Sequence, residues 1–274
     1  MRVLITGANG QLGHDLVDVL AGEELHPFDH RALDIADAAA VDETVGRIKP
    51  QWILNAAAFN DVDGAEQNEA AAFAVNADGP EHLASAAARA GARLIHVSTD
   101  YVFDGQKGSP YDENDKPNPL SVYARSKREG ERRVLASGAP ACVLRTAWLY
   151  GRQGKNFVKA IQAAAARGGP LKVVADQVGS PTATADLAVA IAGLMRTPAT
   201  GLYHVVNGGA CSRFEFARAI VGDQVEILPI STADAARPAP RPANSSLTSV
   251  RWASTGLPPL RSWEAALDAY LREM

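Results

Sequence analysis

The sequence has few cysteines, no strong excess of one charge and no long apolar run, and each absence excludes a class of protein. Cys142 and Cys211 are the only cysteines among 274 residues. We therefore expect two reduced thiols in a cytoplasmic protein, and no disulfide framework. The net charge is -4 without a long basic run, so we expect no nucleic-acid partner. No apolar stretch reaches the roughly 18 residues that span a bilayer, so we expect no membrane partner.

The remaining composition is that of an ordinary globular protein. Hydrophobic residues make up 47% of the chain and charged residues 21%, and this length suits one large or two small domains. The first seven residues already read as a strand entering a turn, so we expect no signal peptide.

Strands and helices alternate through the first 150 residues. Apolar strands are predicted at residues 3–5, 25–28, 52–54, 93–99 and from 141 onward, with helices between them. This alternation predicts an α/β fold with a Rossmann-type, doubly wound parallel sheet. The less regular residues 151–274 predict a smaller α/β substrate domain that covers residues 1–150, either separate from them or interleaved with them.

A glycine-rich turn follows the first strand and precedes the first helix. Its glycines are Gly7, Gly10 and Gly13, with Gln11 and Leu12 opening the helix. Glycine lets the backbone turn tightly and approach a pyrophosphate, and a helix N-terminus favours negative charge. The turn therefore predicts dinucleotide binding, although a turn with a merely structural role has the same sequence.

The ends of the next two strands extend this prediction. Asp29 stands where such folds place an acid for the adenosine ribose, whereas Arg31 could meet a 2′-phosphate. NADPH and NADH therefore both stay open. We expect the cofactor also to contact small or polar residues after these strands, namely Asp34, Ile35, Ala56, Ala57, Ala58 and Asn60. Residues 66–90 are predicted to be helical with an interruption near Gly79-Pro80, and Asn76 within them needs a polar partner.

A tyrosine and a lysine four residues apart suggest the chemistry. Tyr123 and Lys127 would share one face of a helix. A cation beside a phenol lowers the phenol's pKa and makes its proton easier to donate. The alternative is an aromatic residue and a lysine on a half-exposed helix face. Thr99, at the end of an upstream strand, favours the catalytic interpretation because active-site groups of such sheets gather there.

Together these motifs resemble the extended short-chain dehydrogenase/reductase superfamily and, within it, the dTDP-4-dehydrorhamnose reductases. The resemblance covers most of the chain. The segments that carry it are Thr6–Gly13, Asn55–Glu66, Ser98–Phe103, Val122–Lys127, Arg145–Tyr150, Asp176–Thr182 and Arg241–Leu247.

The resemblance implies hydride transfer to the C4 ketone of dTDP-4-dehydro-L-rhamnose, giving dTDP-L-rhamnose for surface polysaccharide. Tyr123 would donate the proton, Lys127 would also bind the nicotinamide ribose, and Thr99 would hydrogen-bond the carbonyl oxygen. The residues expected to contact the substrate are Thr99, Asp100, Tyr101, Trp148, Arg241 and Asn244.

Two departures from related families bear on this reading. The 4,6-dehydratases of the superfamily carry an Asp-Glu pair after the threonine, whereas Asp100 and Tyr101 follow Thr99 here, which favours simple reduction. Some reductases bind Mg²⁺ through glutamates at a dimer contact, whereas this chain has Asp15 in its first helix. Magnesium is therefore doubtful, and we predict no metal site and a monomer or homodimer.

Two functions are alternatives to this reductase. One is another sugar-nucleotide reductase or epimerase, and the other is a non-catalytic subunit resembling the methionine adenosyltransferase β subunit.

Overall fold

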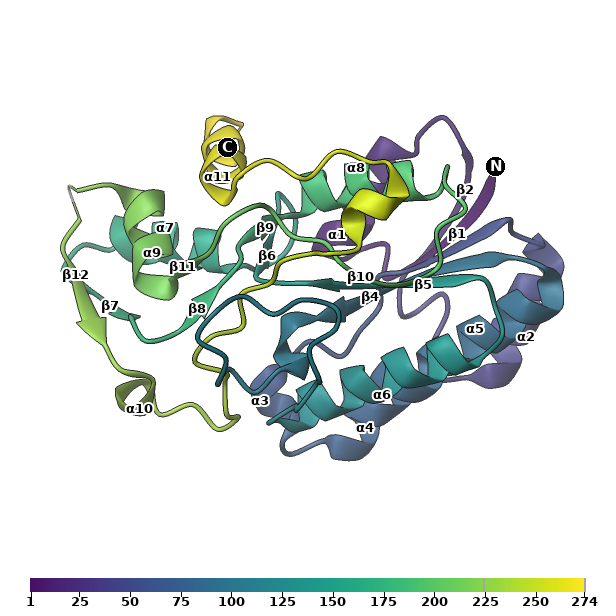
Figure 1. Cartoon of the computed structure of the whole chain (residues 1–274), viewed down its shortest axis with the longest axis horizontal. Coiled ribbons are helices and arrows are strands. Elements are labelled where there is room, and N and C mark those ends of the chain that lie inside the picture. The colour runs from purple at the N-terminus through teal and green to yellow at the C-terminus, as the bar shows by residue number, and fades with distance from the viewer. Residues whose placement is uncertain (224, 274) are drawn as a thin grey trace.

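Six parallel strands form the central sheet of the molecule. The computed structural model describes residues 1–223 and 225–273, and the strand order is β10-β5-β4-β3-β1-β2 (Figure 1). The predicted Rossmann-type α/β fold is confirmed. The strands are β1 (Arg2–Thr6), β2 (Glu24–Phe28), β3 (Trp52–Asn55), β4 (Arg93–Thr99), β5 (Ala141–Thr146) and β10 (Gly201–His204).

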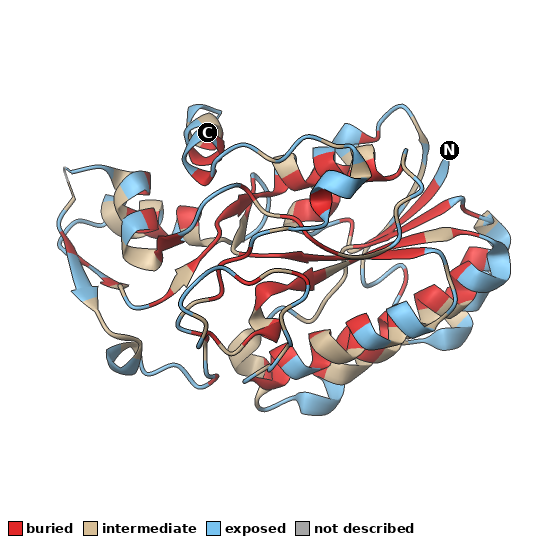
Figure 2. Cartoon of the chain, viewed as in Figure 1, coloured by how far each residue is buried: buried red, intermediate tan, exposed pale blue. Residues whose placement is uncertain are grey.

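Helices cover both faces of this sheet because side chains alternate along each strand. In β1, Val3 and Ile5 pack into the core on one face, and Leu4 packs into the core on the other. Figure 2 shows the buried residues concentrated along the strands and on the inner sides of the helices. The helices are α1 (Gln11–Val19) and α8 (Thr184–Leu194) on the first face, and α2 (Ala38–Ile48), α5 (Gly79–Ala90) and α6 (Val122–Ala136) on the second.

The predicted helix break at Gly79-Pro80 is wrong. A short helix, α4 (Glu69–Phe73), continues into a π-helical turn at Ala74–Asp78, and α5 begins at Gly79. Proline is tolerated in the first turn of a helix, where its missing N–H has no intrahelical partner to lose. The irregular turn instead contains Asn76.

A second lobe is built from short strand pairs and three helices around its own core. Tyr150, Phe216 and Trp263 are buried in that core. The helices are α7 (Phe157–Ala166), α9 (Arg213–Val221) and α11 (Trp263–Arg272), and the paired strands are β7 (Leu171–Val174) with β12 (Ile227–Ile230), β8 (Val178–Gly179) with β11 (Cys211–Ser212), and β6 (Leu149–Tyr150) with β9 (Thr182–Ala183). Two further short helices are α3 (Val62–Ala65) and α10 (Thr232–Ala235).

The chain crosses between the two lobes more than once. β10 pairs with β5 at the edge of the main sheet, and α8 packs on α1, although both belong to the second half of the chain. The division into residues 1–150 and 151–274 stays a prediction. Among the described residues, no helix has both the length and the apolar character needed to cross a bilayer. Both cysteines are buried free thiols.

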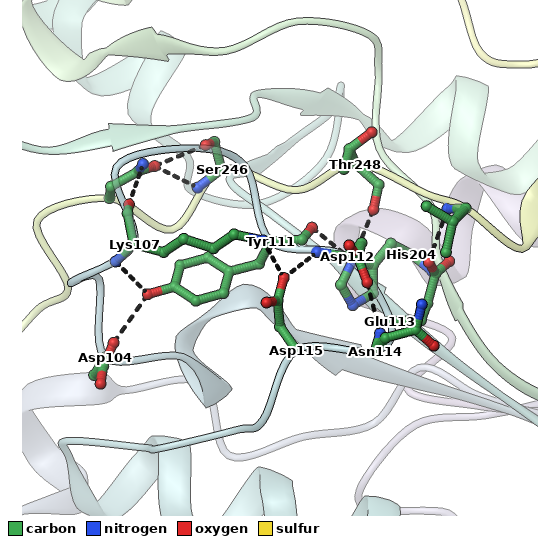
Figure 3. Close-up of polar contacts among 12 residues, drawn as sticks. Asp104, Lys107, Tyr111, Asp112, Glu113, Asn114, Asp115, His204, Ser246 and Thr248 are labelled. Atoms are coloured by element: carbon green, nitrogen blue, oxygen red, sulfur yellow. Dashed lines mark hydrogen bonds and ion pairs between the residues drawn. The ribbon is translucent and has the colours of Figure 1, made fainter.

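The loop between β4 and α6 is held by a polar network that we call the clasp, formed by residues 104–115 with His204 and residues 244–250 (Figure 3). The Tyr111 hydroxyl donates to Asp104 at 2.9 Å. The Glu113 carboxylate accepts from the backbone N–H groups of His204 and Val250 at 2.8 and 2.9 Å. The clasp therefore fixes the segment that joins Thr99 to Tyr123.

Candidate active site

Two adjoining cavities open at the carboxyl ends of the parallel strands, where doubly wound sheets bind ligands. The first has a volume of about 400 Å³ and contains the side chains of Thr99, Tyr123 and Lys127. The second, about 490 Å³, lies over the glycine turn and the end of β2. The two form one groove because they share the lining residues Gly10, Ala56, Ala58 and Asn60.

The glycine turn is shaped so that side chains cannot replace its glycines. Gly7 has φ +71°, and a Cβ on it would lie 2.6 Å from the Ala57 nitrogen. A Cβ on Gly13 would lie 2.2 Å from the Gly7 carbonyl oxygen. The backbone is therefore compact and leaves room for a pyrophosphate at the start of α1, where the helix dipole favours an anion. This geometry fits a dinucleotide.

All of the predicted cofactor residues line this groove. Asp29 is already engaged by protein donors: its Oδ2 accepts from Asn9 at 2.8 Å, and its Oδ1 accepts from the N–H groups of Arg31 and Ala32. Arg31 lines the same cavity. The predicted cofactor residues that line the groove are Gly7, Gly10, Gln11, Leu12, Gly13, Asp29, Arg31, Asp34, Ile35, Ala56, Ala57, Ala58, Asn60, Tyr123 and Lys127.

Asn76 holds the segment after β3 that forms one wall of the groove. Its Oδ1 accepts from the Phe59 N–H at 2.8 Å, and its Nδ2 donates to the Phe59 carbonyl at 3.1 Å. Its Nδ2 also reaches the hydroxyl of Ser126 in α6 at 3.1 Å. The expected partner of this amide is thus the cofactor-facing loop, which Asn76 ties to the helix that carries Tyr123.

The N-terminus of α6 is fixed by two side chains. Ser121 accepts from the Ala124 N–H at 3.2 Å, and Glu66 accepts from the Val122 N–H at 2.8 Å. Satisfying these N–H groups anchors the first turn. Tyr123 and Lys127 then project into the first cavity, with only 8% and 2% of their surfaces exposed.

The expected effect of Lys127 on Tyr123 is corrected by the structure. The Lys127 ammonium donates to the Val97 carbonyl at 2.7 Å, and it is not among the groups that shift the Tyr123 pKa. Burial raises the pKa of Tyr123, while a hydrogen bond with Thr99 opposes that shift. Burial also lowers the pKa of Lys127 to about 8, although nearby Glu131 favours its charged form. Burial therefore sets the direction of the Tyr123 pKa shift in this structure, and that direction is opposite to the one expected from the neighbouring lysine.

Thr99 and its neighbours bring further polar groups to the cavity. The Thr99 hydroxyl donates to Asp100 Oδ1 at 3.1 Å and accepts from the Tyr101 N–H at 3.2 Å. Burial raises the pKa of Asp100 to about 6. Asp100 Oδ2 and the Thr146 hydroxyl are buried and have no partner among the described residues. Because unpaired buried polar atoms are costly, these two atoms are suited to contact a ligand.

Trp148 and Arg213 form the wall of the cavity that belongs to the second lobe. Trp148 has φ +46°, a left-handed conformation that is strained for a tryptophan. The Arg213 guanidinium carbon lies 3.5 Å from the centroid of the Trp148 ring. Sequence reasoning missed Arg213, as well as Lys155 and Thr146, which also line the cavity. No local sequence signal shows that Arg213, at the start of a helix, lines the same cavity as Thr99, which lies more than 100 residues earlier.

Arg241 and Asn244 lie outside the described lining of the cavity. The Arg241 guanidinium donates two hydrogen bonds to the Asp63 carboxylate, at 3.0 and 2.9 Å. The Asn244 side chain donates to the Lys107 carbonyl and accepts from Ser246 in the clasp. Their assignment to the substrate stays a prediction, and in this structure both side chains bind protein groups.

Within residues 1–223 and 225–273, no three His, Cys, Asp or Glu side chains are grouped as a metal ion would require. Asp15, the residue considered for magnesium, lies near the Thr184 hydroxyl. Burial raises the pKa of Asp15, and the hydrogen bond from Thr184 opposes that shift.

The comparisons with known proteins agree with this geometry. The family model described as RmlD substrate binding domain matches residues 1–274. This chain belongs to that family. A dTDP-4-dehydrorhamnose reductase of Mycobacterium tuberculosis is 48% identical to it, over 98% of this chain and 92% of the relative.

Two further relatives of this RmlD-family chain are informative. A crystal structure of a Bacillus anthracis dTDP-4-dehydrorhamnose reductase in complex with NADP has a TM-score of 0.96 at 41% identity. That likeness covers 100% of this chain and 99% of the other. A Streptomyces antibioticus protein named as a probable dTDP-4,6-dihydroxy-2-methyloxan-3-one 4-ketoreductase is 44% identical, over 97% of this chain and 93% of the relative.

Proposed function

We propose that the protein is an NADPH-dependent oxidoreductase that reduces the C4 ketone of dTDP-4-dehydro-L-rhamnose to give dTDP-L-rhamnose. One observation carries the proposal: Thr99, Tyr123 and Lys127 converge in a cavity that adjoins the glycine turn. Membership of the RmlD family, with a 48% identical reductase among its relatives, supports this choice of substrate.

The residues act on the ketone in complementary ways. Bound NADPH would supply the hydride to the carbonyl carbon. Thr99 turns its hydroxyl from Asp100 to the carbonyl oxygen and orients it. Tyr123 then donates its proton to that oxygen. Burial raises the pKa of Tyr123, so the phenol is protonated at neutral pH, as an acid must be before it acts.

Lys127 brings an ammonium group to the same cavity as the phenol. Of its three N–H donors, one is bound to the Val97 carbonyl, and the other two are available to a ribose. The ammonium would therefore hold the nicotinamide ribose at the cavity.

NADPH is favoured over NADH by two observations. Arg31 lines the cavity beside Asp29, where it can meet a 2′-phosphate. The Asp29 carboxylate already accepts from Asn9 and from backbone N–H groups, so it does not need a ribose hydroxyl as a partner. The bound NADP named for the Bacillus anthracis relative supports the same cofactor.

The decisive experiment follows NADPH oxidation by the purified protein with a panel of dTDP- and GDP-linked 4-keto sugars. We expect dTDP-4-dehydro-L-rhamnose to give the highest kcat/KM. Preference for another 4-keto sugar would support a ketoreductase like that named for the Streptomyces antibioticus relative. No ketone reduction, with capture of a stoichiometric synthetase, would identify a regulatory subunit.

Localisation and assembly belong to the same proposal. Two free thiols and a nucleotide-sugar substrate suit a cytoplasmic enzyme. We propose a monomer or homodimer without a nucleic-acid partner or a bound magnesium ion. Light scattering of the purified protein, with and without magnesium, tests the assembly.

A further inference from the structure

Arg213 is held rigidly in the wall of the catalytic cavity. It is the first residue of α9, and its N–H donates to the Gln177 carbonyl at 3.0 Å. Ser212, directly before Arg213, forms a capping box with Glu215 that fixes the start of the helix. The arginine therefore extends from an anchored helix end into the cavity.

Two aromatic rings hold the guanidinium. It lies 3.5 Å from the centroid of Trp148 and 5.0 Å from that of Phe157. Stacking of this kind orients a guanidinium and partly compensates for its loss of water. Trp148 adopts its strained backbone at this contact, and such strain is concentrated at functional sites.

Arg213 forms no close ion pair within the described residues. In the described part of the chain, no acidic oxygen lies within 4.0 Å of its nitrogens. Burial lowers the pKa of Arg213, and the nearby Tyr101 and Asp100 oppose that shift. By contrast, Arg145 is paired with Glu131 at 2.7 Å and Arg241 with Asp63 at 2.9 Å. The half-buried guanidinium is thus in no close ion pair and lines the cavity, so its donors are available to an anionic ligand.

We propose that Arg213 binds the diphosphate of the sugar nucleotide and so places the sugar against Thr99 and Tyr123. This inference rests on the proposed function, since it assumes a nucleoside diphosphate sugar as substrate. The guanidinium fork matches phosphate oxygens in pairs. Lys155 lines the same cavity and adds positive charge. Arg241 is less suited because its own fork is bound to Asp63.

The test separates the diphosphate from the rest of the nucleotide. Calorimetry measures the affinity of thymidine and of thymidine 5′-diphosphate for the unaltered protein and for Arg213→Met, each with NADPH bound. We expect Arg213→Met to weaken diphosphate binding by about tenfold or more and to leave thymidine binding unchanged. For the 4-keto sugar, KM should rise by a similar factor while kcat changes less than about threefold.

Three further variants sharpen this result. Arg213→Lys keeps the charge but loses the stacked fork, so its diphosphate affinity should be intermediate. Arg218 lies on the same helix and donates to the Val225 carbonyl. The Arg218→Met variant should therefore bind thymidine and thymidine 5′-diphosphate as the unaltered protein does. Arg241→Met tests the other candidate arginine, and it should not change the difference in affinity between thymidine and thymidine 5′-diphosphate.

A measurement on the unaltered protein covers the case in which Arg213→Met does not fold. Thymidine 5′-diphosphate, but not thymidine, should slow modification of Arg213 by an arginine-selective dicarbonyl, as mapped by mass spectrometry. Unprotected Arg213, or loss of diphosphate affinity in Arg241→Met alone, would overturn the inference. An unaltered protein that binds the diphosphate through Arg213 but reduces no dTDP-linked ketone would overturn only the proposed substrate. Failure to bind the diphosphate at all would overturn both.

Discussion

The clasp and the catalytic cavity are both polar regions, but they differ in whether their polar side chains have hydrogen-bond partners within the protein. In the clasp, Asp104 and Glu113 each accept several hydrogen bonds from protein donors (Figure 3). In the cavity, Asp100 Oδ2 and the Thr146 hydroxyl have no partner among the described residues, and Arg213 has no ion pair there. The clasp contributes to stability, whereas the cavity keeps polar groups available for a ligand.

Asp100 in the cavity and Asp104 in the clasp have pKa values that are shifted in opposite directions. Burial raises the pKa of Asp100 to about 6. A hydrogen bond from the Asn118 side chain lowers the pKa of Asp104, supported by the Gln106 N–H. The same residue type therefore opposes folding in the cavity when it is ionised, and favours folding in the clasp.

The largest expected effect comes from removing one hydroxyl from the cavity. Tyr123→Phe loses the proton donor but keeps the ring, so turnover should fall by ~10²-fold or more. Affinity for NADPH and the midpoint of urea unfolding should change little, because no protein group depends on this hydroxyl as its main partner. Steady-state kinetics and fluorescence titration with NADPH measure the two effects. Near-normal turnover would remove Tyr123 from the mechanism.

Tyr111→Phe in the clasp is the matched control. The Tyr111 hydroxyl donates to Asp104 and accepts from the Lys107 N–H. Its loss should cost about 1–2 kcal/mol of unfolding free energy, while the kcat of the folded enzyme stays within about threefold. A larger loss of turnover in Tyr111→Phe than in Tyr123→Phe would break the comparison between the two regions.

Asp100→Asn and Asp104→Asn should change stability with opposite dependence on pH. Asp100 has a raised folded pKa, so its contribution is present below the unfolded value of 3.8 and is lost as pH rises through about 6. Asp100→Asn should therefore gain stability relative to the unaltered protein between pH 4 and 7, by on the order of 2 kcal/mol. Asp104 has a lowered pKa, so Asp104→Asn should lose relative stability over the same range.

Urea unfolding at several pH values measures both trends. The same sign of change in the two variants would show that the carboxylates have similar surroundings, contrary to the structure.

A smaller effect is expected in the cofactor half of the groove. Asp29→Ala removes a negative charge beside Arg31, so the ratio of kcat/KM for NADPH to that for NADH should rise several-fold. Asp34 lines the same cavity, so the Asp34→Ala variant shows the effect of removing a second acid for comparison. An unchanged ratio in Asp29→Ala would mean that Asp29 does not affect recognition of the ribose.

The smallest effect concerns a hydroxyl without a partner. Thr146→Val keeps the shape of the side chain and removes a buried polar atom, so unfolding free energy should change by less than about 0.5 kcal/mol or increase slightly. In the clasp, the Ser246 hydroxyl donates to Asn244 Oδ1 at 2.7 Å, so Ser246→Ala should cost about 1 kcal/mol. Equal losses in the two variants would contradict the difference in their hydrogen bonding.

The sequence predicted the regions in which local pattern determines structure. The strand Arg93–Thr99 has the predicted bounds, because apolar periodicity and the turn residues beside it act within a few positions. The glycine turn was recognisable from its spacing within one strand–turn–helix unit. Gly13 is crowded by its own turn, whereas Gly7 is crowded by Ala56 and Ala57 after β3.

The features that sequence reasoning missed depend on contacts between distant segments. Asp63 forms an ion pair with Arg241, 178 residues later, and not with Arg213, 150 residues later. The sequence does not show which of the two arginines is paired. The Tyr123 pKa was predicted in the wrong direction because helical spacing does not show that the phenol is buried, and burial raises its pKa. Nor does that spacing show that the Val97 carbonyl binds the Lys127 ammonium. Strand positions such as Cys211–Ser212 were too short to give a periodic signal.

The pairing of β10 with β5 has a consequence for how the protein is made. A ribosome that has released only the residues before Gly201 has produced five strands of the sheet, with β5 at an uncovered edge. Such an edge can pair with other chains. Translation must therefore proceed through His204 before β5 can pair with β10, and a fragment truncated after β5 should be prone to self-association during expression.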